Sequence, residues 1–187
     1  MQNDLFTGKL VRLTMEEPQS LAEHFSRWGR DSEFSRLLDS EMARLHTVKA
    51  TKEFIEKELA KETPEGFWFV IRTLEGDRVI GDIGLGEILW NHGDTFVGIG
   101  IGEREFWGKG YGTDAMRIIL RYAFTELNLH RVSLDVFEYN PRAIHSYEKA
   151  GFVVEGRARQ YLNREGRRWD LIYMGILRSE WEKTRVF

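Results

Sequence analysis

Residues 98–112 read GIGIGEREFWGKGYG and contain two sets of three alternating glycines. In the first set, Gly98, Gly100 and Gly102 alternate with branched aliphatic residues, which is the period of a β-strand. Successive side chains of a strand point to opposite faces, so one face is aliphatic and the other carries no side chains. Glycine loses more backbone entropy on folding than other residues and has no side chain to pack, so it weakens a strand. We therefore expect a ligand to approach this bare face closely; the alternative is packing against a neighbouring backbone.

The second set, Gly108, Gly110 and Gly112, lies where the strand ends and a helix begins. Thr113 and Asp114 supply a cap and a first-turn acid, and apolar residues then repeat at helical spacing as far as residue 127. A glycine loop that enters a helix presents free N–H groups and the positive end of the helix dipole. The dinucleotide and P-loop glycine patterns both fail here. The stretch therefore predicts a phosphate-binding loop of another kind.

Residues 140–152 read NPRAIHSYEKAGF and predict a second helix, opened by Pro141 and followed by Gly151 at the usual C-terminal glycine position. Asn140 and Tyr147 lie seven residues apart, which is two helical turns, so they share a face with Ala143. That face carries an amide and a phenol on either side of a small residue.

Together the two segments resemble the GCN5-related N-acetyltransferase superfamily, specifically its branch of ribosomal-protein N-terminal and spermidine-type acetyltransferases. The pyrophosphate loop of that family, Q/R-x-x-G-x-G/A, maps onto residues 107–112, with Trp107 in place of glutamine or arginine. The pattern N-x-x-A-x-x-x-Y-x-x-x-G-F matches residues 140–152 at every fixed position. The resemblance covers most of the chain and is strongest from Val97 to Phe152.

This resemblance implies an acetyl-CoA-dependent N-acetyltransferase that works by direct transfer in a ternary complex. Tyr147 is the implied catalytic residue, because a phenol can protonate a departing thiolate; the alternative is a half-buried tyrosine that only packs under the sheet. A backbone N–H of the glycine strand can meet the oxyanion. The implied cofactor-binding residues are Gly100, Ile101, Gly102, Trp107, Gly108, Lys109, Gly110, Tyr111, Gly112, Thr113, Asn140, Ala143 and Lys149.

The acceptor and the general base stay open at this point. The acceptor is a protein N-terminal amine, a polyamine or another small amine, and Glu87 and Glu103 are candidate bases or plain surface acids. An acidic first helical region would suit a cationic acceptor, but solvated helix faces explain it equally well; its members are Asp31, Glu33, Asp39, Glu41, Glu53, Glu56, Glu58 and Glu62. Other functions to weigh are a silent acyl-CoA-binding module, or a ribosome- or RNA-binding protein that uses five arginines near the C-terminus, Arg157, Arg159, Arg164, Arg167 and Arg168.

Composition sets further bounds. The chain has 187 residues, no cysteine, five scattered histidines and a net charge of −3. From the length, we expect one domain over residues 1–187. The lack of cysteine and the scattered histidines predict no metal site. We expect no DNA binding and no membrane association, because neither the charge nor any apolar run favours them. A cytoplasmic protein is the default expectation, and a homodimer is left open.

The pattern of elements predicts an α/β fold. Expected strands cover residues 10–13, 67–73, 78–90, the glycine strand, 131–137, 152–162 and 169–177. Expected helices cover residues 16–28, 51–62, 113–127 and 141–150, with a helical turn and a loop over 31–49. In the implied fold, helices flank one twisted, mixed and mostly antiparallel sheet of about six or seven strands, whose central strands splay apart.

Overall fold

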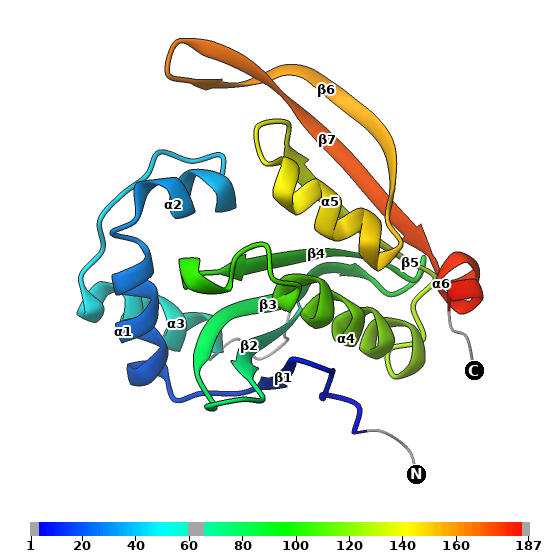
Figure 1. Ribbon diagram of the computed structural model, residues 1–187, viewed down its shortest axis with the longest axis horizontal. Helices are drawn as coiled ribbons and strands as arrows, with labels where there is room; N and C mark the ends of the chain where they lie inside the picture. Colours follow the sequence, from blue (N-terminus) through cyan, green and yellow to red (C-terminus); the bar gives the residue numbers. More distant parts are fainter. Residues whose placement is uncertain (1–3, 60–65, 185–187) are drawn as a thin grey trace.

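The computed structural model describes residues 4–59 and 66–184 (Figure 1). Its strands are β1 (Val11–Thr14), β2 (Phe67–Thr73), β3 (Val79–Leu89), β4 (Asp94–Ile101), β5 (Arg131–Phe137), β6 (Val153–Arg164) and β7 (Arg167–Leu177). Its helices are α1 (Pro18–Trp28), α2 (Ser32–Leu38), α3 (Val48–Leu59), the short 3-10 helix η1 (Arg104–Phe106), α4 (Tyr111–Thr125), α5 (Pro141–Ala150) and α6 (Arg178–Thr184).

All seven strands form one sheet in the order β1-β2-β3-β4-β5-β7-β6. Every neighbouring pair is antiparallel except β4 and β5, which are parallel. This parallel pair is short, because it joins only Asp94–Phe96 to residues 131–133 before the two strands separate. The expected mixed, mostly antiparallel sheet with splayed central strands is therefore confirmed.

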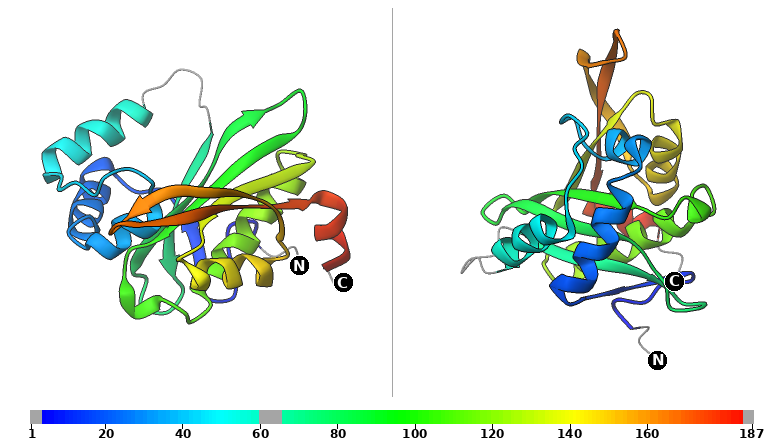
Figure 2. Two further views of the ribbon diagram at one scale, coloured as in Figure 1. Left: turned by 90° about the horizontal axis from the view of Figure 1, so that it is seen from above. Right: turned by 90° about the vertical axis from the view of Figure 1, so that its left-hand side faces the viewer.

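Each face of the sheet is covered by its own helices (Figure 2). On one face, α4 buries Met116, Ile119 and Phe124 against the central strands, in a core that also contains Val132 and Leu134 of β5. On the other face, a second core joins α1, α2 and α3 to β2 and β3; its buried members are Leu21, Ala22, Trp28, Phe34, Ile55, Val70 and Val79. The splayed strands β4 and β5 thus open between two helical layers.

The glycine face of β4 is not bare, and that expectation is wrong. A Cβ atom at Gly102 would lie 2.0 Å from the ring of Trp28, and one at Gly100 would lie 3.2 Å from Leu38 Cδ1. Side chains of α1 and α2 therefore fill the space that these two glycines leave. Only Gly98 faces open space within this row, since nothing lies within 4 Å of its Cβ position.

Several boundaries also differ from the expectations. Residues 32–38 form a helix because Asp31 caps it, with its side chain accepting from the N–H groups of Glu33 and Phe34. Helix α3 begins at Val48, while its expected end at Glu62 lies outside the described residues. Helix α6 has no counterpart among the expected elements, and the closing hairpin turns over two residues in left-handed conformations, Glu165 (φ 53°) and Gly166 (φ 74°). None of the helices in the described part of the chain could cross a membrane, since none combines the required length and apolarity.

Candidate active site

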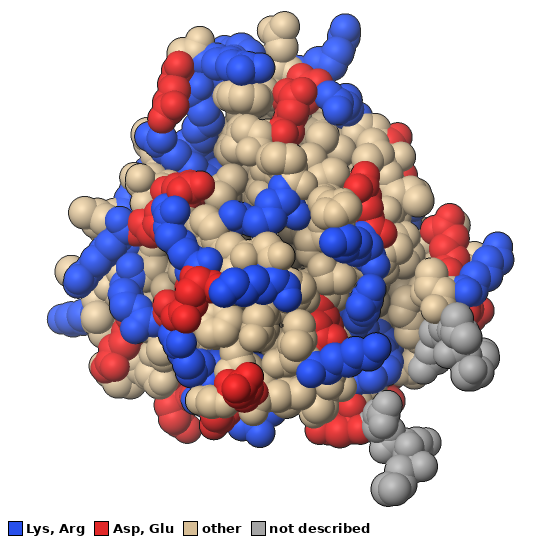
Figure 3. All heavy atoms as spheres, in the orientation of Figure 1, with Lys and Arg blue, Asp and Glu red and all other residues tan. Residues whose placement is uncertain are grey.

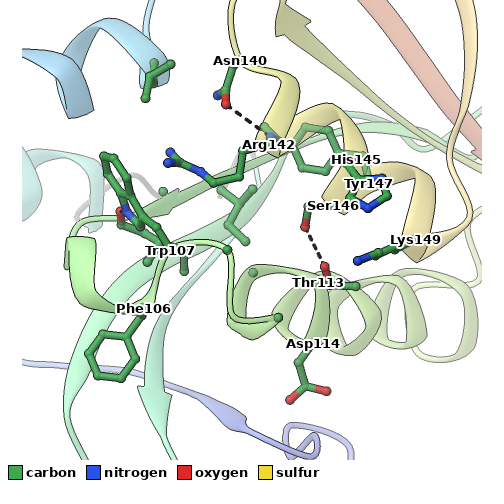
Figure 4. Close-up of a pocket in the computed structure, with 18 of the residues that line it drawn as sticks. Phe106, Trp107, Thr113, Asp114, Asn140, Arg142, His145, Ser146, Tyr147 and Lys149 are labelled. Atoms are coloured by element: carbon green, nitrogen blue, oxygen red, sulfur yellow. Dashed lines mark hydrogen bonds between the residues drawn. The ribbon is translucent and has the colours of Figure 1, made fainter.

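A cavity of about 540 Å³ lies where β4 and β5 separate (Figure 4). Its walls are the β4 segment 99–101, the loop that leads into α4, and the pocket-facing side of α5. Phe34 and Leu38 of α2 cover one end, and Lys9 and Leu10 lie at the other. The two segments that the sequence singled out, residues 98–112 and 140–152, therefore meet around one space.

The loop before α4 has the geometry of an anion site. Gly108 and Gly110 have left-handed conformations, with φ of 70° and 91°, which favour glycine. The first backbone bond into α4 runs from the N–H of Asp114 to the carbonyl of Gly110, so the N–H groups just before Asp114 have no intrahelical partner. A Cβ at Gly108 would meet nothing within 4 Å. The loop thus offers room and N–H donors to a diphosphate, and four cations line the same cavity, Lys9, Arg117, Arg142 and Lys149.

Two side chains fix this loop to the rest of the fold. Asp114 Oδ2 accepts hydrogen bonds from the N–H groups of Lys9 (2.9 Å), Leu10 (2.7 Å) and Val11 (3.1 Å). The hydroxyls of Thr113 and Ser146 share a hydrogen bond of 2.7 Å, which joins the start of α4 to α5. Asp114 therefore holds the segment before β1 rather than the ligand side of the loop.

The backbone edge of β4 that faces the cavity is formed by Ile99 and Ile101. The N–H of Gly102 donates to Ile80 on β3, so the alternate residues 98 and 100 also direct their N–H groups toward β3. Ile99 and Ile101 then direct their backbone groups toward the opening beside β5, where no strand pairs with them. The structure thus offers backbone partners to an extended ligand along this edge, and not across the glycine face.

Trp107 stands where the family pattern has glutamine or arginine, and its side chain has a defined place. Its Nε1 donates to the carbonyl of Ile101 at 2.6 Å, and the guanidinium of Arg142 lies 3.8 Å from its ring centroid (Figure 4). A cation at this distance is attracted to the indole face. Trp107 therefore places a guanidinium from α5 at the wall of the cavity.

Helix α5 contributes the amide and the phenol. Asn140 caps the helix, because its Oδ1 accepts from the N–H of Ala143 at 3.2 Å, and its amide nitrogen is left for a ligand. Tyr147 lines the cavity. Burial, and then the nearby Asp135 carboxylate, raise the pKa of Tyr147 to about 12, so its hydroxyl stays protonated at neutral pH.

A surface formed by glycines lies on the α2 side of the opening. It consists of Gly84 and Gly86 on β3 and Gly98 and Gly100 on β4, with Gly84 paired to Gly98, and we call it the glycine floor. Gly86 and Gly98 face open space. Asp135 is the first residue of β5 on this face beyond the short parallel pairing. Burial raises its pKa, and so do the carboxylates of Glu87 and Asp39, which means that negative charge is concentrated beside the floor.

Of the two candidate bases, Glu103 is held elsewhere. Its Oε1 accepts from the indole N–H of Trp28 at 2.9 Å and from Arg27. Glu87 lies at the bulge of β3 with φ of 52°, and its charge acts on Asp135. Sequence reasoning missed both Asp82 and Asp135; Asp82 lies opposite Gly100 and Asp135 opposite Tyr173, and neither pairing could be known without the strand register.

At least four of the eight acids in the first helical region form ion pairs within the described part of the chain. Asp31 and Glu33 both bind Arg104, and Glu53 and Glu56 of α3 form exposed pairs with lysines four residues earlier. Glu62 lies outside the described residues. An acidic wall built from this region is therefore wrong for these four residues, because local ion pairs already balance their charge.

At least three of the five arginines of the closing hairpin have partners within the described fold, including Arg167, whose guanidinium lies 3.8 Å from the ring centroid of Trp169. Arg157 pairs with Glu138 and Asp170, and Arg164 donates to the backbone carbonyls of Asp39 and Glu41. On the face shown in Figure 3, basic and acidic side chains are interspersed and form no continuous basic surface. Over residues 4–59 and 66–184, no group of three or more histidines and acids could hold a metal ion.

Comparison with known proteins matches residues 12–153 to a family model described as an acetyltransferase (GNAT) domain. The chain is 34% identical over 113 residues to the uncharacterized N-acetyltransferase p20 of Bacillus licheniformis, and 39% identical over 104 residues to the spermidine N(1)-acetyltransferase of Vibrio cholerae. These alignments cover 60% and 56% of this chain, and less than two thirds of each relative, 63% and 60%.

A solved structure agrees over a greater length. The spermidine N-acetyltransferase of Vibrio cholerae, in complex with CoA and spermine, superposes with a TM-score of 0.78 at 27% identity. The match covers 92% of this chain and 96% of that one. The match therefore extends beyond residues 12–153, which the family model matches.

Proposed function

Because the chain belongs to the acetyltransferase (GNAT) family and is an acetyl-CoA-dependent N-acetyltransferase, we propose that its acceptor is a polyamine or a similar cationic alkylamine. The observation that carries this proposal is the negative charge beside the open part of the glycine floor, where burial, and then the carboxylates of Glu87 and Asp39, raise the pKa of Asp135. An ammonium group bound there is attracted to these carboxylates, because opposite charges at short range favour each other. The similarity to spermidine acetyltransferases supports the same class of acceptor.

The residues that line the cavity are suited to bind acetyl-CoA, the acetyl donor. When bound, acetyl-CoA supplies an acetyl group activated as a thioester. We assign its diphosphate to the N–H groups of the loop from Gly108 to Thr113, and its pantetheine arm to the β4 edge at Ile99 and Ile101 and to the amide of Asn140. The cations of this wall add attraction for the phosphates.

Tyr147 is the proposed acid. The raised pKa keeps its hydroxyl protonated, and a protonated phenol can donate to the sulfur as the carbon–sulfur bond breaks. A backbone N–H on the free edge of β4 can stabilise the oxyanion of the same step, because it is fixed in place before the reaction.

An acceptor panel tests the proposed substrate class. Thiol release from acetyl-CoA is measured with spermidine, spermine, putrescine, single amino acids, aminoglycosides and peptides with free N-termini. We expect kcat/KM for a polyamine to exceed that for an N-terminal peptide by about a hundredfold, since two charge contacts are each worth about tenfold. The KM for the polyamine should rise with salt, because partly exposed charges are screened. A peptide that outperforms every polyamine would contradict the proposal.

A further inference from the structure

Asp82 on β3 holds a buried carboxylate oxygen that the reaction described so far does not use. Its Oδ2 accepts from the indole N–H of Trp68 at 3.0 Å. Its Oδ1 is buried and has no hydrogen-bond partner among the described residues, although part of the residue reaches the surface. Buried polar atoms are nearly always hydrogen-bonded, so an orphaned oxygen in a native fold requires an explanation.

The orphaned oxygen lies beside the cavity. Asp82 pairs with Gly100 on β4, and Oδ1 is 3.2 Å from the Cβ position of that glycine. The same point is 3.2 Å from Leu38 Cδ1 and 3.5 Å from Phe34 Cζ. Gly100, Leu38 and Phe34 all line the cavity, so Oδ1 lies just behind this part of the cavity wall. Leu38 ends α2 and is 46% exposed, which leaves its side chain room to turn outward.

We propose that Asp82 is the general base of the transfer, and that its Oδ1 takes a proton from the acceptor's ammonium group once the amine displaces Leu38 above Gly100. The inference rests on the proposed function in one respect, namely that the acceptor arrives as an ammonium ion. It assigns the missing proton acceptor to a residue at the end of the glycine floor opposite to Asp135.

The proton and electron balance is complete with groups already named. An N–H bond of the ammonium breaks and an O–H bond forms at Asp82, which frees the nitrogen lone pair to bond to the acetyl carbon. The carbon–sulfur bond then breaks with its electron pair going to sulfur, which takes the proton of Tyr147. The second amine proton, lost as the amide forms, returns to the Tyr147 oxygen, and Asp82 releases its proton to solvent.

The surroundings of Asp82 suit this role better than those of the other acids. The elements packed against it supply Trp68 from β2, Gly100 from β4, and Phe34 and Leu38 from α2, none of which carries a charge. Burial raises the pKa of Asp82 to about 6, against a smaller opposing effect of the Trp68 hydrogen bond. A base with this pKa is ionised at neutral pH and still binds a proton more tightly than an ordinary aspartate.

The experiment is a pH profile of kcat/KM from pH 5 to 9.5, measured with whichever amine the acceptor panel identifies. The wild type should lose activity below about pH 6, where Asp82 becomes protonated. Asp82→Asn should lower kcat/KM at pH 7 by about a hundredfold, and its residual activity should climb with pH as the amine loses its own proton. The amine used is found independently, so a wrong substrate class and a wrong base give different results.

Two further variants complete the test. Trp68→Phe keeps the carboxylate but removes the hydrogen bond that favours its charged form, so the acid limb of the profile should move to higher pH. Asp135→Asn should raise the KM for the amine and leave the acid limb in place. Wild-type kcat/KM in Asp82→Asn, or an unmoved acid limb in Trp68→Phe, would overturn the assignment. If Asp82→Asn does not fold, Trp68→Phe decides the matter alone.

Discussion

The two rows of glycine in this protein look alike in sequence but are needed for different reasons. In the first row, a side chain at Gly102, just after β4, would collide with Trp28 of α1, and one at Gly100 would crowd Leu38 of α2; neither glycine has a left-handed backbone. In the loop before α4, Gly108 and Gly110 are needed because their φ angles are positive, and space around them is ample. The first row serves packing between a sheet and helices distant in sequence, and the second serves local backbone geometry.

The difference explains why the loop could be interpreted from sequence and the strand could not. A positive φ follows from the loop-to-helix pattern of a few neighbouring residues. What covers a strand face depends on helices about 60 to 75 residues away, as the contact of Trp28 with Gly102 shows. Substitutions that separate chemistry, packing, backbone geometry and open space can test this comparison.

The largest effect is expected at Tyr147, the proposed acid, which lines the cavity. Tyr147→Phe should lower kcat by about a hundredfold and change both KM values little, because only the proton donor is lost. Steady-state kinetics with acetyl-CoA and the identified amine measure both quantities. Wild-type turnover would show that Tyr147 takes no part in the reaction and that its side chain only packs under the sheet.

The next largest effect is expected on the free energy of unfolding, at the first glycine row, which packs against α1 and α2. Gly102→Ala should lower the free energy of unfolding by about 1–3 kcal/mol, because a Cβ 2.0 Å from the Trp28 ring forces α1 to shift. Gly112→Ala is the matched control: its Cβ would make ordinary contacts of 3.8–3.9 Å within a helix, so stability should change by less than about 1 kcal/mol. Urea denaturation compares the two, and equal losses would contradict the packing role.

A smaller effect on stability is expected in the loop. Gly110→Ala places a side chain at φ 91°, which should cost about 1–2 kcal/mol. The KM for acetyl-CoA should rise by about tenfold while the amine KM stays close to wild type, because a relaxed loop turns its N–H groups away from the phosphates. An unchanged acetyl-CoA KM would show that these N–H groups do not bind the diphosphate.

The smallest stability effect is expected at Gly98, the glycine of β4 that has open space at its Cβ position. Gly98→Ala should change the free energy of unfolding by less than about 0.5 kcal/mol, since nothing lies within 4 Å of the new methyl group. The methyl would instead occupy the glycine floor, so the KM for the amine should rise by about threefold or more. An amine KM equal to that of the wild type would place the acceptor elsewhere.

Much of the fold and half of the candidate site could be predicted from sequence. Strand 67–73 and the start of α5 at Pro141 follow from alternation and proline placement, and the loop and Tyr147 follow from two local patterns. Asp82 and Asp135 could not be identified from sequence, because their positions at the site depend on the register of the neighbouring strands. The contact of Trp107 with Arg142 of α5 could not be found either, because it joins two separate segments of the chain.

The contacts of Asp114 carry a consequence for how the protein assembles. The three N–H groups that its carboxylate binds lie 103 to 105 residues earlier in the chain. The start of α4 is therefore completed only when two distant stretches meet, and such long-range contacts form slowly during folding. Hydrogen–deuterium exchange at the amides of Lys9, Leu10 and Val11 during refolding should thus show when the loop before α4 has formed.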